Sequence, residues 1–384
     1  MKEGQVMRIE RVEVFPLVSE RPKFNRRQFP IPVTQDWWGG DQTLIRIHTD
    51  DGISGWGSCG IRGDLAQGSL EALTPLLIGE NALDVERVTD KLQQSACWYG
   101  RGGVLTAFVG AINIGLWDIL GQACKQSVST LLGGRYRDRI RPYASQLFSY
   151  PVRPMVRRLT AAREQGFRAF KLGWADFGRI DLATDEAMVK AARKAVGEDC
   201  DLMVDAGGSQ AYWHGNIKWA ADAARMLHEY NVVWFEEALR PDDVEGFKQL
   251  RELSPVPIAT GECLRRRQAF YPFIYNKAVD ILQPDLTVVG GISEGRRIGW
   301  LANDESILVV FHGWNTAVGL AADLQLTAAL EQAKFVEYQT GTPYIDGILA
   351  SPLKLDKDGM LPIPTKPGLG IDVDLAWVKR HGPR

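Results

Sequence analysis

Residues 167–174 read FRAFKLGW, a short apolar run typical of a buried strand, with Lys171 in its middle. An unpartnered buried ammonium group is costly, so this lysine needs a reason. Similar apolar runs recur along the chain, and amphipathic segments such as DEAMVKAARKAVG lie between them. Together with this one, the runs are at residues 141–148, 167–174, 201–208, 232–239, 257–262, 281–291, 306–313 and 334–339. Eight successive βα units predict an α/β fold built on a closed (β/α)8 barrel of the TIM type. An open, doubly wound sheet is the alternative, although no GxGxxG motif opens the first unit.

The sequence before residue 139 has a different pattern. Strand-like alternation in MRIERVEVFPL, TLIRIHT and ISGWGS is followed by helical patterns from residue 65 to residue 133. We therefore expect an α+β capping domain at 1–138, a barrel carrying the site at 139–345, and a tail at 346–384 that packs back on the capping domain. Residues 23–42 are rich in Pro, Gly and aromatic residues and predict either a lid or a loop that packs on the domain surface.

Composition excludes several classes of protein. The 384 residues carry a net charge of −2, which gives no sign of a nucleic-acid partner. Five scattered cysteines without a CxxC pair argue against a disulfide framework or a structural zinc site. The charged N-terminus does not resemble a secretory signal, and no long uncharged apolar stretch predicts a membrane partner. We expect a cytoplasmic protein.

Polar residues recur where the predicted barrel strands end. Their spacing is about one βα unit, so they should converge on one mouth of the barrel. A single buried acid is usually a paired structural residue, but a whole series in phase indicates chemistry. The series is Lys171, Asp205, Glu236 with Glu237, Glu262, Asp285, His312 and Glu337.

Three of these carboxylates, Asp205, Glu236 and Glu262, lie on adjacent predicted strands. Without a cation they would repel one another, and one or more would take up a proton. Oxygen ligands without Cys or His favour a hard cation such as Mg²⁺ over zinc, and leave coordination positions open for substrate. We predict one Mg²⁺ ion per active site.

The remaining members of the series predict acid/base chemistry. Asp285 can orient the imidazole of His312 and raise its basicity. Lys171 should face His312 across the metal ligands, an arrangement suited to removing a proton next to a carboxylate whose enediolate the cation stabilises. Glu337 could donate a hydrogen bond to a developing anion if protonated, or form a structural pair.

The sequence resembles the enolase superfamily and, within it, the mandelate racemase/muconate lactonizing enzyme subgroup. The resemblance is carried by these residues and by the motifs TLIRIHTDDGISGWG, VDAG, WFEEAL, GEC, ILQPDLTVVGGISE, FHGW and KPGLGID. The resemblance covers nearly the whole chain. It implies that Asp205, Glu236 and Glu262 bind Mg²⁺ with Glu237 as their outer partner. It also implies that Lys171 and the His312–Asp285 pair are the two acid/base groups, that Glu337 bonds the substrate carboxylate, and that loops near 23–42 and 59–64 close over the substrate. A homo-oligomer is expected from the family alone.

Three positions depart from the subgroup's patterns. Its Lys-x-Lys reads Ala169-Phe170-Lys171, its Asp-x-Asn reads Asp205-Ala206-Gly207, and its Glu-Glu-Pro reads Glu236-Glu237-Ala238. The first two changes remove polar groups near the substrate. The resemblance therefore does not extend to one named substrate, and mandelate is a poor candidate.

The first hypothesis for function is an acid-sugar dehydratase, a lyase that acts on an aldonate or aldarate in carbohydrate acid catabolism and yields a 2-keto-3-deoxy acid. The preference rests on analogy with the subgroup. The runner-up is an isomerase (a racemase, epimerase or cycloisomerase) acting on a related carboxylate or sugar lactone through the same enediolate. A Schiff-base aldolase that uses Lys171 and a non-catalytic sugar-binding protein are the alternatives from other classes. Arg265–Arg267 follow a predicted ligand and either face the substrate or lie on the surface.

Overall fold

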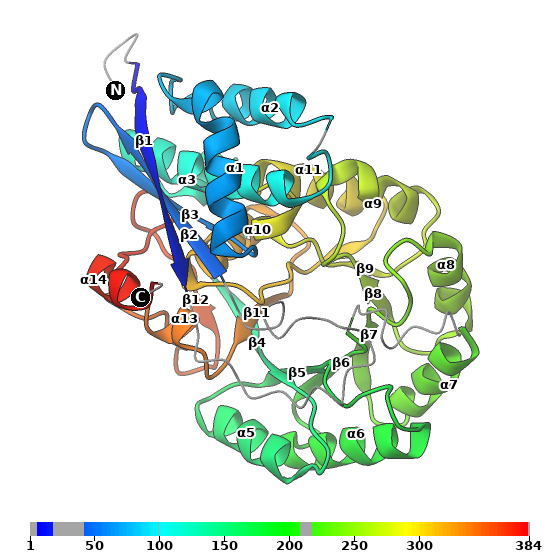
Figure 1. Cartoon of the computed structure of the whole chain (residues 1–384). Coiled ribbons are helices and arrows are strands. Elements are labelled where there is room, and N and C mark those ends of the chain that lie inside the picture. Colours follow the sequence, from blue (N-terminus) through cyan, green and yellow to red (C-terminus); the bar gives the residue numbers. More distant parts are fainter. Residues whose placement is uncertain (1–5, 18–41, 99, 208–216, 383–384) are drawn as a thin grey trace.

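The computed structural model describes residues 6–17, 42–98, 100–207 and 217–382. The predicted lid therefore lies outside the described residues, except for its last member, Gln42. Figure 1 shows a ring of strands with helices outside it, and a smaller group of elements at one side of the ring. That group is formed by the N-terminal part of the chain.

The N-terminal group is α+β, as the sequence pattern predicts. An antiparallel sheet in the order β1-β2-β3 is formed by Ile9–Leu17, Gln42–Thr49 and Ser54–Cys59. The turn between the last two strands closes where Gly52 donates its N–H to the Thr49 carbonyl, 3.1 Å away. The helices are α1 (Gly63–Leu77), α2 (Val85–Ser95), α3 (Val104–Cys124) and α4 (Val128–Leu131).

Helix α3 joins this capping group to the barrel. It is the one described helix that is long and apolar enough to cross a membrane, but 83% of its apolar window is buried inside the protein, as in a core helix. From it, Asn113 donates its side-chain N–H to Ser293 Oγ at 2.8 Å and accepts the Ser293 backbone N–H at 3.1 Å. Trp117 donates to the same hydroxyl at 3.0 Å. The cap is thus fixed to the barrel by satisfied buried polar groups.

All eight predicted barrel strands are present. They are β4 (Arg139–Leu147), β5 (Ala169–Gly173), β6 (Asp201–Asp205), β7 (Val232–Glu236), β8 (Ile258–Thr260), β9 (Ile281–Leu282), β10 (Leu308–Val309) and β11 (Phe335–Gln339). Neighbouring strands pair in parallel from β10 back to β4, and β11 pairs with β4. Within the described chain the hydrogen-bonded path stays open between β10 and β11.

Helices connect these strands on the outside of the ring (Figure 1). They are α5 (Arg153–Glu164), α6 (Leu182–Val196), α7 (Ile217–His228), α8 (Val244–Leu253), α9 (Arg266–Tyr275), α10 (Leu286–Val289), α11 (Ile292–Asp304) and α12 (Ala317–Ala329). The short helix α13 (Pro343–Asp346) follows the last barrel strand. Local chemistry sets their ends. For example, Asp181 caps α6 by accepting the Thr184 N–H at 2.7 Å, and Gly197 ends it at a φ of 82°.

Two strands are much shorter than predicted. The run at 281–291 is a strand only at Ile281–Leu282, and residues 286–289 are helical. Pro284 has no N–H to continue a ladder, and Asp285 then caps the short helix by accepting the Thr287 N–H at 2.7 Å. The run at 306–313 is a strand only at Leu308–Val309. Asp285 and His312 therefore lie in the connections just beyond their strands.

The tail contacts both the barrel and the cap. Strand β12 (Leu361–Pro362) pairs antiparallel with β4, and Gly368 forms a bridge with Ser127. The Leu369 N–H donates to Asp118 Oδ1 of α3 at 2.9 Å. The tail ends in α14 (Leu375–Arg380). The domain limits at residues 138 and 345 stay a prediction.

Candidate active site

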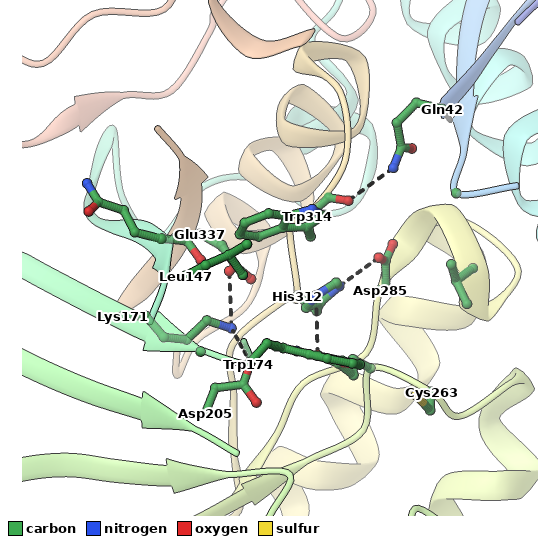
Figure 2. A pocket seen from close by; sticks show the side chains of 16 residues that line it. Gln42, Leu147, Lys171, Trp174, Asp205, Cys263, Asp285, His312, Trp314 and Glu337 are labelled. Carbon is green, nitrogen blue, oxygen red and sulfur yellow. Dashed lines mark hydrogen bonds and ion pairs between the residues drawn. The ribbon is translucent and has the colours of Figure 1, made fainter. Parts of the chain in front are cut away.

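A cavity of about 240 Å³ opens at the carboxyl ends of the barrel strands (Figure 2). Six of the residues predicted from sequence line it: Lys171, Asp205, Glu262, Asp285, His312 and Glu337. Glu236 lies just below them, fully buried. The phase argument from the sequence therefore placed all these groups correctly at one mouth.

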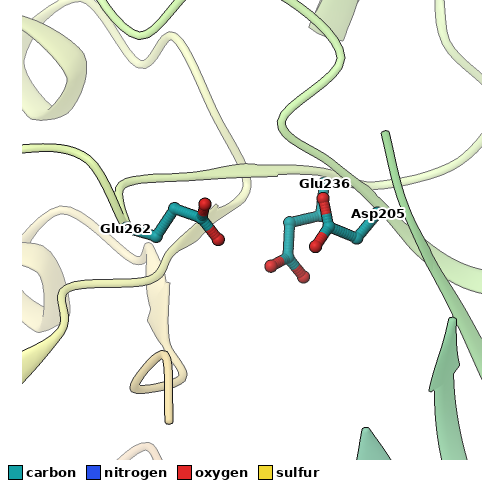
Figure 3. Close-up of side chains that lie close together, drawn as sticks. All are labelled: Asp205, Glu236 and Glu262. Atoms are coloured by element: carbon teal, nitrogen blue, oxygen red, sulfur yellow. The ribbon is translucent and has the colours of Figure 1, made fainter. Parts of the chain in front are cut away.

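The three acids predicted as metal ligands cluster (Figure 3). Asp205, Glu236 and Glu262 each offer one oxygen, and these oxygens lie within 4.8 Å of one another. Gly173 permits the approach, because a Cβ there would come within 2.8 Å of Asp205 Oδ2. Burial, followed by the charge of Glu236, raises the pKa of Asp205 well above its usual value. The cluster is thus an electrostatically unfavourable group of acids that a cation would stabilise.

Glu236 is held from two sides. Its Oε2 accepts from Trp234 Nε1 at 2.9 Å and from Gln283 Nε2 at 2.7 Å. Its Oε1 accepts from Lys171 Nζ at 2.6 Å. These three donors fix the orientation of a fully buried carboxylate.

Lys171 is buried among carboxylates and does not reach the surface. Its Nζ lies 2.6 Å from Glu236 Oε1, 3.1 Å from Glu337 Oε1 and 3.8 Å from Asp205 Oδ2. Burial lowers the pKa of Lys171, but the charges of Glu236 and Glu337 outweigh it and hold the pKa well above its usual value. In this arrangement the group is an ammonium that balances the acid cluster.

His312 faces a carboxylate on each side of its ring. Nδ1 lies 2.8 Å from Asp285 Oδ2, and Nε2 lies 3.3 Å from Glu262 Oε2. Asp285 is itself oriented, because its Oδ1 accepts from the backbone N–H and the hydroxyl of Thr287. Burial lowers the pKa of His312, but Glu262 and the bond to Asp285 raise it well above its usual value.

Glu337 lies on the other side of Lys171. Its Oε2 accepts from the Gly313 N–H at 2.8 Å and from Tyr143 Oη at 3.2 Å. Burial opposes ionisation, but Lys171 and His312 lower the pKa of this carboxyl to about 2. In this arrangement Glu337 is a hydrogen-bond acceptor, and its hydrogen bond to a developing anion stays a prediction.

Glu237 points away from the cavity into the barrel wall. Its Oε1 accepts from Thr260 Oγ1 and from the Gly261 N–H, both at 2.8 Å. Burial and the charge of Glu262 raise its pKa to about 8. Its backbone has a φ of 49°, which is costly for a residue with a side chain. This left-handed turn directs Glu236 and Glu237, which are adjacent in sequence, to different surroundings.

Further residues complete the cavity wall. Gln42 and Gly60 of the cap come from the two loops that the family resemblance placed over the substrate. Sequence reasoning missed Ser145, Gln146 and Leu147 of β4, and also Trp174, Cys263, Val288 and Trp314. The cap is connected to the mouth where Gln42 Nε2 donates to the Trp314 carbonyl at 3.2 Å. Trp174 and Trp314 follow Lys171 and His312 closely in the chain, and position just beyond a strand end was the signal that could have identified them. Arg265 does not line the cavity, and its guanidinium donates to the Cys263 carbonyl.

Two family models match the chain. Residues 37–133 match the mandelate racemase/muconate lactonizing enzyme N-terminal domain, and residues 154–377 match the enolase C-terminal domain-like family. The chain belongs to the enolase superfamily. Within the superfamily it falls in the mandelate racemase/muconate lactonizing enzyme group.

Individual relatives agree with this placement. D-galactarolactone cycloisomerase of Agrobacterium fabrum is 32% identical over 86% of this chain and 88% of its own length. D-xylonate dehydratase of Haloferax volcanii is 31% identical over 88% of this chain and 84% of its own length. The crystal structure of the 3,6-anhydro-D-galactonate cycloisomerase of Zobellia galactanivorans superposes with a TM-score of 0.87 at 30% identity, covering 98% of this chain and all of that one.

These similarities bear on the predictions from sequence. The predicted superfamily and the barrel fold with its separate capping domain are confirmed. The names of the relatives agree with the predicted enzyme class, a lyase with an isomerase as the runner-up.

Proposed function

We propose that this protein removes the proton α to the carboxylate of an acid sugar and then expels the 3-hydroxyl, giving a 2-keto-3-deoxy acid. One observation carries the proposal: a lysine and a histidine line one cavity together with three clustered carboxylates. The reaction needs such a set, because a base must act beside groups that stabilise the negative charge left behind.

The acid cluster fits a divalent metal ion. Asp205, Glu236 and Glu262 supply only oxygen atoms, and the ionic partner of Glu262 Oε2 is His312 Nε2, 3.3 Å away. Hard oxygen donors in this number suit Mg²⁺, and we propose one ion per site. When bound, Mg²⁺ would supply positive charge that stabilises the anion formed by proton removal and offsets the carboxylate charge around Lys171.

The protein's own residues would carry the protons. One of Lys171 and His312 takes the α-proton as the Cα–H bond breaks. The His312 imidazolium then protonates the departing 3-hydroxyl as the C3–O bond breaks, and the enol that remains tautomerises to the keto acid. Asp285 holds the imidazole at 2.8 Å throughout. Glu337 positions Lys171 from 3.1 Å and is also placed to meet the substrate.

A cycloisomerase is the second candidate. Two relatives bear this name, D-galactarolactone cycloisomerase and 3,6-anhydro-D-galactonate cycloisomerase. The first half of the reaction would be the same removal of an α-proton. The difference lies in the bond that breaks next, which would be a ring C–O bond in place of the bond to a free hydroxyl.

A panel of acid sugars incubated with the protein and Mg²⁺ in D₂O tests the proposal. We expect a keto product that semicarbazide detects, with activity lost to EDTA and restored by Mg²⁺. Deuterium at the α-carbon without a keto product would replace the dehydratase with a racemase or epimerase. Covalent trapping of substrate on Lys171 by borohydride would overturn the proposal in favour of an aldolase.

We also propose a cytoplasmic homo-oligomer that acts on a small carboxylate and takes neither nucleic acid nor membrane as a partner. The near-neutral net charge and the scattered free cysteines support this assignment. Size-exclusion chromatography with light scattering would test the oligomeric state directly.

A further inference from the structure

Trp174 occupies an unusual place at the cavity. It directly follows β5, three residues after Lys171, and it lines the cavity. Its φ is 55° and that of Ala175 is 53°, so two consecutive residues with side chains are left-handed. Each such conformation costs about 1–2 kcal/mol. Strain of this kind at a pocket is a reason to look for a function.

Gly207 makes room for this tryptophan. Its φ is +90°, and a Cβ added there would lie 2.6 Å from Trp174 Cδ2 and 2.7 Å from Cγ. No real Cβ tolerates such contacts with a ring held on strained backbone. Gly207 is also the position at which the superfamily resemblance led us to expect asparagine. The missing side chain and the indole are therefore two parts of one local arrangement.

The indole forms an apolar wall of the cavity. In Figure 2 it is seen edge-on, with one face turned toward His312 and Trp314. Leu147 and Val288 add further apolar lining. A flat aromatic face buries apolar surface well only against a ligand that presents a continuous C–H face. A sugar ring has such a face, whereas an open polyol chain interrupts its C–H groups with hydroxyls.

We propose that Trp174, accommodated by Gly207, is a specificity-determining residue that packs on the ring face of the substrate. The preferred substrate is then an acid sugar that contains a ring and bears its carboxylate toward the carboxylate cluster and Lys171. This inference rests on the α-proton removal of the proposed function, and it favours the second candidate, because in a 3,6-anhydro acid the ring oxygen takes the place of a free 3-hydroxyl.

Two probe ligands isolate the effect of the ring on binding affinity. 3,6-anhydro-D-galactonate and D-galactonate each carry one carboxylate and six carbons, and only the first contains a ring. We expect calorimetry with Mg²⁺ present to give about tenfold tighter binding of the ring probe. Trp174→Ala should weaken the ring probe about tenfold and the open probe less than about threefold. Trp300→Ala, which removes a half-exposed indole on α11, is the matched control and should change neither Kd.

The role of Gly207 is tested by a double-mutant cycle. Gly207→Ala should weaken the ring probe about tenfold in the wild-type background, because its Cβ displaces the indole. In the Trp174→Ala background, Gly207→Ala should weaken binding of the ring probe by less than about threefold. The backbone cost of a side chain at φ +90° is present in both backgrounds and cancels in the cycle. Melting temperatures of the four proteins show whether each one folds.

Three results would overturn the inference: equal weakening of both probes by Trp174→Ala, additive effects in the cycle, or no binding of either probe. Failure here is distinct from failure of the proposed function. The α-proton exchange of other acid sugars in D₂O, and its loss in Lys171→Met, do not depend on a preference for rings.

Discussion

Two layers of the same barrel strands differ completely in character. The lower layer is an apolar plug of Tyr143, Ala169, Met203, Trp234, Ala259, Ile281 and Val310. The upper layer holds the charged groups of the cavity. Ala169 is followed two residues later by Lys171, Met203 by Asp205, and Trp234 by Glu236. Because side chains on one face of a strand recur every second residue, each charged group lies directly above a packed one.

The difference between the two layers shows how this barrel stabilises a group of buried charges. The upper residues repel one another or lose hydration, while the lower ones pack as a rigid core. The two layers also make contact, since Trp234 Nε1 reaches up to Glu236 and Tyr143 Oη to Glu337. Aromatic residues with one polar atom suit this boundary, because the ring is buried and the polar atom finds a partner above. Ala169, where the subgroup has a second lysine, is fully buried inside the plug.

The largest expected effect comes from removing the proton-carrying groups of the upper layer. Lys171→Met and His312→Asn should each lower turnover about a thousandfold, because general acid/base groups contribute on that scale. The measurement is product formation and α-proton exchange on the acid sugar identified by the panel. Lys379→Met removes an exposed lysine of α14 and should leave both rates unchanged. Exchange that stays within about tenfold of wild type would remove Lys171 or His312 from the mechanism.

The next effect concerns the acid cluster. Asp205→Asn and Glu236→Gln should each weaken Mg²⁺ binding about a hundredfold, because an amide oxygen replaces a charged ligand. Calorimetric titration with Mg²⁺ measures this without reference to turnover. Asp222→Asn, at an exposed position of α7, is the matched control. Unchanged affinity in the first two variants would make the cluster a structural group balanced by Lys171 alone.

The upper layer was more predictable from sequence than its surroundings. Charged residues in an apolar run are conspicuous, and their spacing of one βα unit identified the mouth without any contact information. The plug was not identified, because Ala, Met and Trp in a strand are ordinary core residues. Trp174 was missed as a cavity residue for the same reason. Its exposure depends on the left-handed backbone at 174 and 175 and on the space above Gly207, which no periodicity encodes.

Strand lengths were also beyond sequence reasoning. ILQPDLTVVGG reads as one apolar run, yet Pro284 and the capping carboxylate of Asp285 convert most of it into a turn and a short helix. The prediction placed Asp285 on a strand, whereas the cap geometry orients it toward His312. The error in secondary structure did not move the residue from the mouth, because Asp285 still lies at the carboxyl end of β9.

A buried carboxylate outside the barrel provides a contrast with the upper layer. Asp118 of α3 accepts the Trp56 N–H at 3.0 Å and the Leu369 N–H at 2.9 Å. Burial raises its pKa from 3.8 to about 6. The folded state therefore binds the proton more tightly than the unfolded state. Its contribution to stability is complete below about pH 4 and is lost as the pH rises toward 6.

Urea unfolding of wild type and Asp118→Asn from pH 4 to pH 8 tests this contrast. The free energy of unfolding of wild type relative to the variant should fall by about 2 kcal/mol between pH 4 and 6 and stay level above that. The variant keeps one acceptor oxygen but cannot titrate. A difference that rises with pH would mean that the two backbone donors hold Asp118 ionised, as the ionic partners hold Glu337.

The smallest expected effect lies where the two layers meet. Trp234→Phe keeps an aromatic ring in the plug but removes the donor to Glu236 Oε2, leaving only Gln283 at 2.7 Å on that oxygen. Groups that orient a metal ligand typically change affinity about tenfold or more, so we expect Mg²⁺ binding and turnover to fall by about that factor. Trp300→Phe on α11 is the matched control.

Stability must be measured on the same Trp234→Phe sample, because the smaller ring leaves space in the plug. A lower melting temperature with normal Mg²⁺ affinity would mean that the plug supports the cavity only by packing. A loss of Mg²⁺ affinity with little change in melting temperature would mean that the plug also sets the direction of the carboxylate above it. The second outcome is the one expected, because a fully buried oxygen with a lost donor turns toward its remaining partner.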